Sequence, residues 1–218
     1  GAVITGSAAM VTERADWSEH TAEWIRDAMD AQTPLFGVCY GHQLMAHALG
    51  GTVGWLPAGR EIGTESIARL ATGEIPGSCE LPSLFPAHTP PRQSVLAPPP
   101  DAHTLARSEL DPHQLLRYAP HALSTQFHPE FSTEHMRAYI DARADALRKE
   151  GLDPDALRAD VRETEAARAL LEGFAHAALD TPVAAAVVKS QAMEGRSDVS
   201  VSESSIRVRV SSVRSDQG

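Results

Sequence analysis

The segment PLFGVCYGHQ, residues 34–43, constrains the fold of this chain more than any other. Residues 35–38 form a continuous apolar run, which is typical of a strand covered on both faces. Residues 41–49 are predicted to form a helix closed by Gly50 and Gly51. Cys39 therefore lies at the hinge between a buried strand and a helix, and this arrangement favours an α/β fold.

The glycines on either side of Cys39 indicate a nucleophile elbow. So sharp a strand-to-helix turn strains the backbone of its central residue and crowds the positions two before and two after it, here Gly37 and Gly41. The following helix N-terminus would stabilise a thiolate, and the N–H of Tyr40 would point to where an oxyanion forms. An inert buried cysteine would require neither glycine. The other cysteine, Cys79, lies in a Pro/Gly-rich stretch without such a frame.

A base for this thiol could come from any of 10 histidines. His128 is the most distinctive, because it ends a predicted strand and the stiff Pro129 separates it from Glu130. A carboxylate at that spacing can hold the imidazole in one tautomer and stabilise its protonated form. The alternative is a histidine at a strand end beside an ordinary surface glutamate.

Strands and helices alternate along the rest of the chain. We expect strands in residues 1–7, within 52–70 and twice within 115–127. We expect helices over about 18–32, capped by Ser18, about 133–150 and about 155–179, with a break at 151–154, and a surface loop over most of 73–100. This order predicts a doubly wound, flavodoxin-like α/β sheet with helices on both faces and a site at the carboxyl ends of its strands.

Composition narrows the function classes. A chain of 218 residues with 42% hydrophobic content predicts one domain or at most two, here residues 1–183. The serine-rich residues 184–218 are expected to be a flexible tail, or else an edge strand over 199–210. Scattered basic residues and a net charge of −10 argue against nucleic acid as a partner. No leader or membrane-spanning run is seen, so a cytoplasmic location is expected. Histidine spacings such as His42 and His47 give no convincing metal site.

The segment around Cys39 and the segment around His128 together resemble one protein family. Residues 34–43 followed by QFHPE, residues 126–130, are similar to the class I, or triad, glutamine amidotransferases, and above all to the glutaminase domain of GMP synthetase. The resemblance spans essentially residues 1–180, and the helical end looks most like stand-alone bacterial amidotransferase-like proteins.

The resemblance implies roles for individual residues. Cys39 would be the nucleophile, His128 the base and acid, and Glu130 the group that orients His128. The oxyanion donors would be the backbone N–H groups of Tyr40 and of the Gly6-Ser7 turn. Gln43 matches the position that helps to hold the amino acid end of the substrate, although a solvated helix glutamine is the alternative.

The implied activity is hydrolysis of the side-chain amide of glutamine through a γ-glutamyl thioester, without a metal or organic cofactor. The alternatives are a γ-glutamyl peptidase with the same triad and a non-catalytic amidotransferase-like subunit. No Walker-type loop or Ser-Gly-Gly-x-Asp-Ser loop occurs in the sequence, so a separate synthetase would have to use any transferred ammonia.

The sequence departs from the family at two places. Members usually carry a strand, a helix and a second strand ahead of the segment that matches Gly1-Ser7, about 40 residues by the size of a βαβ unit. We therefore expect that this sequence lacks the first strand and helix of the family; the alternative is a protein that exposes an unusual sheet edge. At residues 86–90, Ala87-His88 matches a Ser-His-Gly-Asp-like signature only in part.

Overall fold

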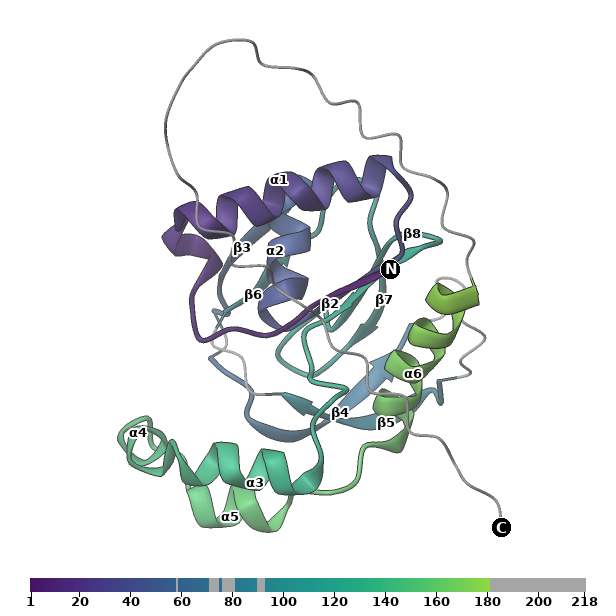
Figure 1. Ribbon diagram of the computed structural model, residues 1–218. Helices are drawn as coiled ribbons and strands as arrows, with labels where there is room; N and C mark the ends of the chain where they lie inside the picture. The colour runs from purple at the N-terminus through teal and green to yellow at the C-terminus, as the bar shows by residue number, and fades with distance from the viewer. Residues whose placement is uncertain (58, 71–74, 76–80, 90–92, 181–218) are drawn as a thin grey trace, which may run out of the picture. The chain divides into compact units, whose positions relative to one another are not determined.

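The computed structural model describes residues 1–57, 59–70, 75, 81–89 and 93–180 (Figure 1). The strands are β1 (Ala2–Ile4), β2 (Leu35–Val38), β3 (Thr52–Trp55), β4 (Gly63–Arg69), β5 (Leu84–Thr89), β6 (Gln93–Ala97), β7 (His103–Arg107), β8 (Leu115–Ala119) and β9 (Ala122–Thr125). The helices are α1 (Asp16–Asp30), α2 (Tyr40–Ala48), α3 (Thr133–Asp141), α4 (Ala144–Lys149), α5 (Pro154–Ala159) and α6 (Glu165–Asp180), with a 3-10 turn, η1 (Val11–Glu13).

A mixed sheet of seven strands organises the fold, in the order β1-β2-β9-β8-β7-β4-β5. β1, β2 and β9 run parallel to one another, whereas every further pair in the sheet is antiparallel. β3 and β6 form a separate antiparallel ribbon. The predicted α/β fold is confirmed, with parallel pairing confined to one end of the sheet.

Helices cover both faces of the parallel part, and the apolar run of β2 explains why. Leu35 packs into a cluster with residues of α1 and α2, such as Ile25 and Leu44. Phe36 points to the opposite face and packs against Phe174 of α6, with ring centroids 5.1 Å apart. Successive side chains of a strand face opposite ways, so a strand buried on both faces needs an unbroken apolar sequence.

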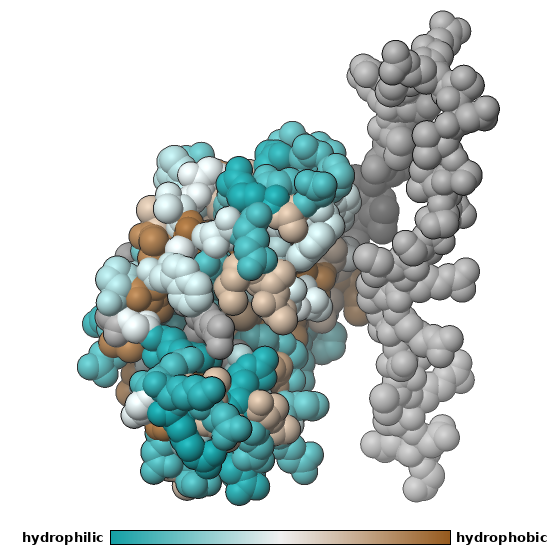
Figure 2. All heavy atoms as spheres, turned by 90° about the vertical axis from the view of Figure 1, so that its left-hand side faces the viewer, coloured by the Kyte–Doolittle hydropathy of each residue, from teal (hydrophilic) through white to brown (hydrophobic). Residues whose placement is uncertain are grey.

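A small helical unit, α3 to α5, has a core of its own. Met136, Ile140, Leu147 and Val161 are buried together there with Ile62. In the face shown in Figure 2, the lower part of the surface is mostly hydrophilic, as expected for helices that bury only one side. Among the described residues, none of the helices is long and apolar enough to cross a membrane.

The prediction of a loop over most of residues 73–100 is wrong, because β5 and β6 lie in this segment. The prediction relied on proline content, and Pro86 lies within β5. β5 is an edge strand, paired only with β4 in the sheet, and an edge strand tolerates a proline because one side of its backbone needs no ladder partner. β7 was not predicted at all.

The predicted helices also differ in their boundaries. Ser18 does not cap α1, because the helix begins at Asp16 and the buried Ser18 hydroxyl lies 2.5 Å from the hydroxyl of Tyr40. The expected helix over 133–150 is divided into α3 and α4. The expected break at 151–154 is confirmed, with Gly151 at a φ of 82°.

The second expected helix, over 155–179, is divided into α5 and α6 because the chain changes cores between them. Val161 belongs to the small core of the helical unit, whereas Ala167 belongs to the core beneath the sheet. The tail alternatives for residues 184–218 lie outside the described residues, as does Cys79, so the domain boundary at 183 stays a prediction.

Candidate functional site

The parallel strands bring the predicted site residues to one edge of the sheet. Gly6 follows β1, Cys39 follows β2, and His128 lies shortly after β9. Since these strands are parallel neighbours, their carboxyl ends meet at the same edge. This is the edge at which open α/β sheets place their binding sites.

Cys39 occupies a strained turn between β2 and α2. Its φ of 52° and ψ of −100° are rarely adopted by a residue with a side chain. The turn is held on both sides, because the Cys39 N–H donates to the Thr125 carbonyl at 2.8 Å and the Cys39 carbonyl accepts from the Gln43 N–H at 3.1 Å. Cys39 is a free cysteine and is largely buried. The backbone therefore has the geometry of a nucleophile elbow.

Gly37 and Gly41, which flank Cys39, have no room for a side chain. A Cβ on Gly37 would lie 2.7 Å from the carbonyl oxygen of Gly41 and 2.7 Å from the sulfur of Met45. A Cβ on Gly41 would overlap the backbone carbonyl of Ile4 in β1. Backbone atoms cannot move aside as a flexible side chain can, so both positions exclude larger residues.

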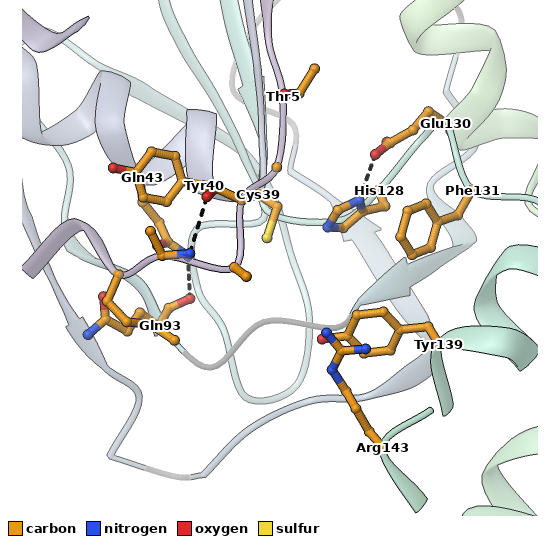
Figure 3. Close-up of a pocket in the computed structure, with 15 residues that line it drawn as sticks. Thr5, Cys39, Tyr40, Gln43, Gln93, His128, Glu130, Phe131, Tyr139 and Arg143 are labelled. Carbon is orange, nitrogen blue, oxygen red and sulfur yellow. Dashed lines mark hydrogen bonds and ion pairs between the residues drawn. The ribbon is translucent and has the colours of Figure 1, made fainter. Parts of the chain in front are cut away.

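His128 and Glu130 form a pair beside Cys39. Nδ1 of His128 lies 2.7 Å from Oε1 of Glu130, and the backbone N–H of His128 donates to the His88 carbonyl at 2.8 Å. Figure 3 shows the sulfur of Cys39 turned toward the imidazole. With Nδ1 directed at the carboxylate, Nε2 is left for the side of the thiol.

The electrostatic setting favours a protonated His128. Burial alone would lower the pKa of the imidazole, but its interactions with the side chains of Cys39 and Glu130 outweigh burial and raise the pKa to about 9. A histidine with this pKa carries its proton at neutral pH. It can therefore stabilise a neighbouring thiolate and donate a proton to a leaving group.

Gly6 lies against both reactive side chains. A Cβ at this position would lie 2.9 Å from Cε1 of His128 and 3.7 Å from the Cβ of Cys39. The backbone N–H of Ala9 donates a hydrogen bond to the hydroxyl of the next residue, Ser7, at 3.1 Å. This hydrogen bond shapes the turn. Tyr40, at the first position of α2, borders the same space.

These residues line one cavity of about 540 Å³. Its wall contains every predicted site residue except Gly37 and Gly41. These two glycines flank Cys39 in the turn and do not line the cavity. The full lining is Thr5, Gly6, Ser7, Ala8, Ala9, Met10, Cys39, Tyr40, Gln43, Gln93, His128, Glu130, Phe131, Tyr139 and Arg143 (Figure 3).

Gln43 is a fixed part of the cavity wall and not a solvated helix residue. Its side chain is 4% exposed, and its Nε2 donates to the Gln93 carbonyl at 2.6 Å and to Oε1 of Gln126 at 3.1 Å. Both amide hydrogens are thereby used. The amide oxygen of Gln43 is the atom that stays available to accept a hydrogen bond from a ligand.

Other buried histidines lie outside the cavity. His42 is fully buried with Nδ1 2.7 Å from the Ser124 hydroxyl, and burial lowers its pKa to about 3. His88 is also fully buried, and burial lowers its pKa to about 4. Both are therefore neutral packing residues, and neither has access to a ligand. Within the described ranges, no cluster of three or more histidine, cysteine or acidic residues could hold a metal ion.

Sequence reasoning missed the wall formed by Phe131, Tyr139 and Arg143. The His128 and Phe131 rings are 4.2 Å apart, and the Arg143 guanidinium lies 3.6 Å above the Tyr139 ring. The sequence contained one indication of this pair, because residues four apart, such as Tyr139 and Arg143, face the same side of a helix. Their place beside the cavity depends on how α3 packs, which no local pattern records.

Comparison with known proteins identifies the family of the chain. The family model described as "Glutamine amidotransferase class-I" matches residues 2–144. The chain is 28% identical over 144 residues to gamma-glutamyl peptidase 5 of Arabidopsis thaliana, covering 65% of this chain and 57% of the relative. It is 32% identical over 142 residues to the glutamine-hydrolyzing GMP synthase of Aeropyrum pernix, covering 65% of this chain and 26% of the relative. The chain thus spans little more than half of the peptidase and about a quarter of the synthase.

Solved structures support the fold. A crystal structure of a glutamine amidotransferase from Thermotoga maritima superposes with a TM-score of 0.69 at 23% sequence identity, covering 82% of this chain and 78% of that one. At this level of identity, the likeness concerns the fold and not the substrate.

Proposed function

The chain belongs to the class-I glutamine amidotransferase family, and we propose that it hydrolyses γ-glutamyl amide bonds with Cys39 as the nucleophile, His128 as acid and base, and Glu130 as the orienting group. The observation that carries this proposal is the strained Cys39 elbow beside a His128 whose Nδ1 lies 2.7 Å from Glu130. Strained backbone is retained where a function requires it.

In the first half of the reaction, the Cys39 thiolate attacks the γ-carbonyl carbon of the substrate. The carbonyl oxygen becomes an oxyanion, which the backbone N–H of Tyr40 and those of the Gly6-Ser7 turn stabilise. The protonated Nε2 of His128 then donates its proton to the nitrogen that departs. The C–N bond breaks, leaving a γ-glutamyl thioester on Cys39.

In the second half, water replaces the thiolate. His128, now neutral, accepts a proton from the water as it attacks the thioester carbonyl. The C–S bond breaks and glutamate leaves. The Glu130 carboxylate holds the imidazole in the required tautomer throughout and does not itself transfer a proton.

The acyl half of the substrate is assigned to the side of the cavity that contains Gln43. A γ-glutamyl group carries an α-ammonium, and the amide oxygen of Gln43 can accept a hydrogen bond from it, since Nε2 is already bonded to Gln93 and Gln126. This agrees with the role that the family resemblance implies for Gln43.

Two substrates fit this chemistry, and they differ only in the leaving group. Glutamine releases ammonia, and a separate synthetase would have to use the ammonia if it is transferred. A γ-glutamyl peptide releases an amino acid or peptide. The relatives include proteins named for each reaction, GMP synthase and gamma-glutamyl peptidase. A non-catalytic subunit is the less favoured reading, because binding alone would not require a strained cysteine beside a histidine-carboxylate pair.

Glutamate release by the purified full-length chain tests the proposal. Glutamine and γ-glutamylalanine are each supplied, with and without candidate synthetases, to the wild-type protein and to Cys39→Ala. We expect glutamate from at least one substrate with the wild type and none with Cys39→Ala. Failure of the wild type on every γ-glutamyl amide, or equal release by Cys39→Ala, would contradict the proposal.

A further inference from the structure

An unbroken series of ring contacts leads from His128 away from the nucleophile. The ring of Phe131 lies 4.2 Å from that of His128 and 6.2 Å from that of Tyr139. The guanidinium of Arg143 then lies 3.6 Å above the Tyr139 ring. All four side chains line the same cavity as Cys39. A ligand bound at Cys39 and extending past His128 therefore meets Arg143.

The stacking leaves the charged edge of Arg143 able to bind a ligand. A guanidinium stacked on an aromatic ring uses its face, whereas its N–H donors point outward in its plane. No carboxylate of the described residues lies within ion-pair distance of Arg143. The nearest acidic group in the cavity wall, Glu130, is paired with His128 at 2.7 Å. Arg143 is thus a cation held in place by an aromatic ring and facing a cavity.

Arg143 also lies on a definite side of the scissile bond. In Figure 3, Gln43, Tyr40 and Gln93 lie on one side of Cys39, and Phe131, Tyr139 and Arg143 lie on the side of His128. The group that protonates the departing nitrogen must adjoin the leaving group. The wall that continues from His128 to Arg143 is therefore the wall along which the leaving group lies.

From this geometry we propose that Arg143, stacked on Tyr139, binds the free carboxylate of the departing amino acid or peptide, so that the preferred substrates are γ-glutamyl conjugates that end in a carboxylate. The inference rests on the proposed hydrolysis at Cys39 and specifies its substrate class.

The chemistry of the stacked Arg143 guanidinium favours a carboxylate as its ligand. The planar guanidinium matches a carboxylate with two parallel, charge-assisted hydrogen bonds. Ammonia, the product leaving from glutamine, offers no group for Arg143 to bind. The site would therefore lower KM for a γ-glutamyl amino acid and contribute little to the hydrolysis of glutamine.

A matched pair of substrates tests this inference. γ-Glutamylalanine carries the carboxylate, whereas γ-glutamylalaninamide has the same shape without the charge. In the wild-type full-length chain, kcat/KM for the acid is expected to exceed that for the amide by about 10- to 100-fold, the range of a charge-assisted hydrogen bond. In Arg143→Gln the ratio is expected to fall to about one, mainly through KM, and Arg143→Lys is expected to restore part of it.

Arg148→Gln is the control, because Arg148 is an exposed arginine of α4 that does not line the cavity. It should keep the wild-type ratio. Melting temperatures of all variants exclude a folding defect as the cause. A wild-type ratio near one, or a ratio unchanged in Arg143→Gln, would overturn the Arg143 inference while leaving the hydrolase intact. If neither substrate nor glutamine releases glutamate, the proposed function itself is wrong.

Discussion

Gly6 and His128 are in such close contact that a methyl group added to Gly6 would displace the imidazole. A Cβ on residue 6 would lie 2.9 Å from Cε1 of the imidazole. The Gly6-Ser7 turn after β1 and the proposed acid-base residue after β9 therefore lie in contact across the site.

Gly6→Ala is expected to reduce kcat by about 10- to 100-fold, because the imidazole must turn away from Cys39 and small misplacements of reacting groups are costly. The melting temperature should change little, since the atom that must move belongs to a side chain. Steady-state kinetics and thermal unfolding measure the two effects. Wild-type kcat in Gly6→Ala would show that His128 does not act from this position.

Cys39→Ala is expected to lower turnover by more than about 1,000-fold with nearly unchanged thermal stability, because the thiol forms the covalent intermediate and its loss opens only a small cavity. Cys79→Ala is the control, since Cys79 is the other of the 2 cysteines in the chain. Loss of activity in Cys79→Ala together with its retention in Cys39→Ala would reverse the assignment.

Gly41→Val is expected to prevent folding and activity together, because its Cβ would overlap the Ile4 carbonyl of β1. Gly50→Ala provides a matched control. Gly50 has a φ of 98° with open space around it, so alanine there should cost about 1 kcal/mol of unfolding free energy and leave the activity of the folded protein intact. A soluble, fully active Gly41→Val protein would argue against the elbow.

The pH dependence of kcat/KM should follow the proton on His128. The pKa of His128 is raised from 6.5 to about 9, so the imidazole is protonated at neutral pH and loses its proton as pH rises through about 9. A deprotonated His128 cannot donate a proton to the leaving nitrogen, so kcat/KM should fall on the alkaline side. Glu130→Gln removes one interaction that raises the pKa and should move this limb to lower pH. An alkaline limb that stays in place in Glu130→Gln would show that Glu130 does not act on His128.

Glu130→Gln should also lose less activity than His128→Ala. The glutamine side chain can still accept a hydrogen bond from Nδ1, whereas alanine removes the proton donor altogether. Comparison of kcat for the two variants, with melting temperatures as the control, measures the difference. Equal wild-type rates in both would remove the pair from the mechanism.

The elbow could be predicted from sequence because its constraint is local. Gly37, Cys39 and Gly41 all contribute to one turn, and a turn that excludes Cβ atoms can be recognised from the two glycines alone. The pair of His128 and Glu130 is local in the same way, since only Pro129 separates them. Their place beside Cys39 was expected from the family resemblance alone, and the structure accounts for it, because the strands before Cys39 and His128 are adjacent and parallel.

Features that depend on distant packing could not be predicted. Pro86 suggested a loop, but it lies in an edge strand where its missing N–H is harmless. The helix expected over 133–150 is interrupted after Asp141, although no glycine or proline lies there to indicate a break. The interruption follows from the burial of Ile140 and Leu147 in one small core, and it is this packing that brings Arg143 beside the cavity.

The central claim is a covalent γ-glutamyl thioester on Cys39, and mass spectrometry of acid-quenched protein tests it most directly. The full-length chain is mixed with glutamine or γ-glutamylalanine, quenched during turnover and digested. We expect a γ-glutamyl adduct on the peptide that contains Cys39, labile to hydroxylamine as a thioester is, and no adduct in Cys39→Ala. Turnover with an adduct on another residue, or glutamate release by Cys39→Ala at the wild-type rate, would contradict the account.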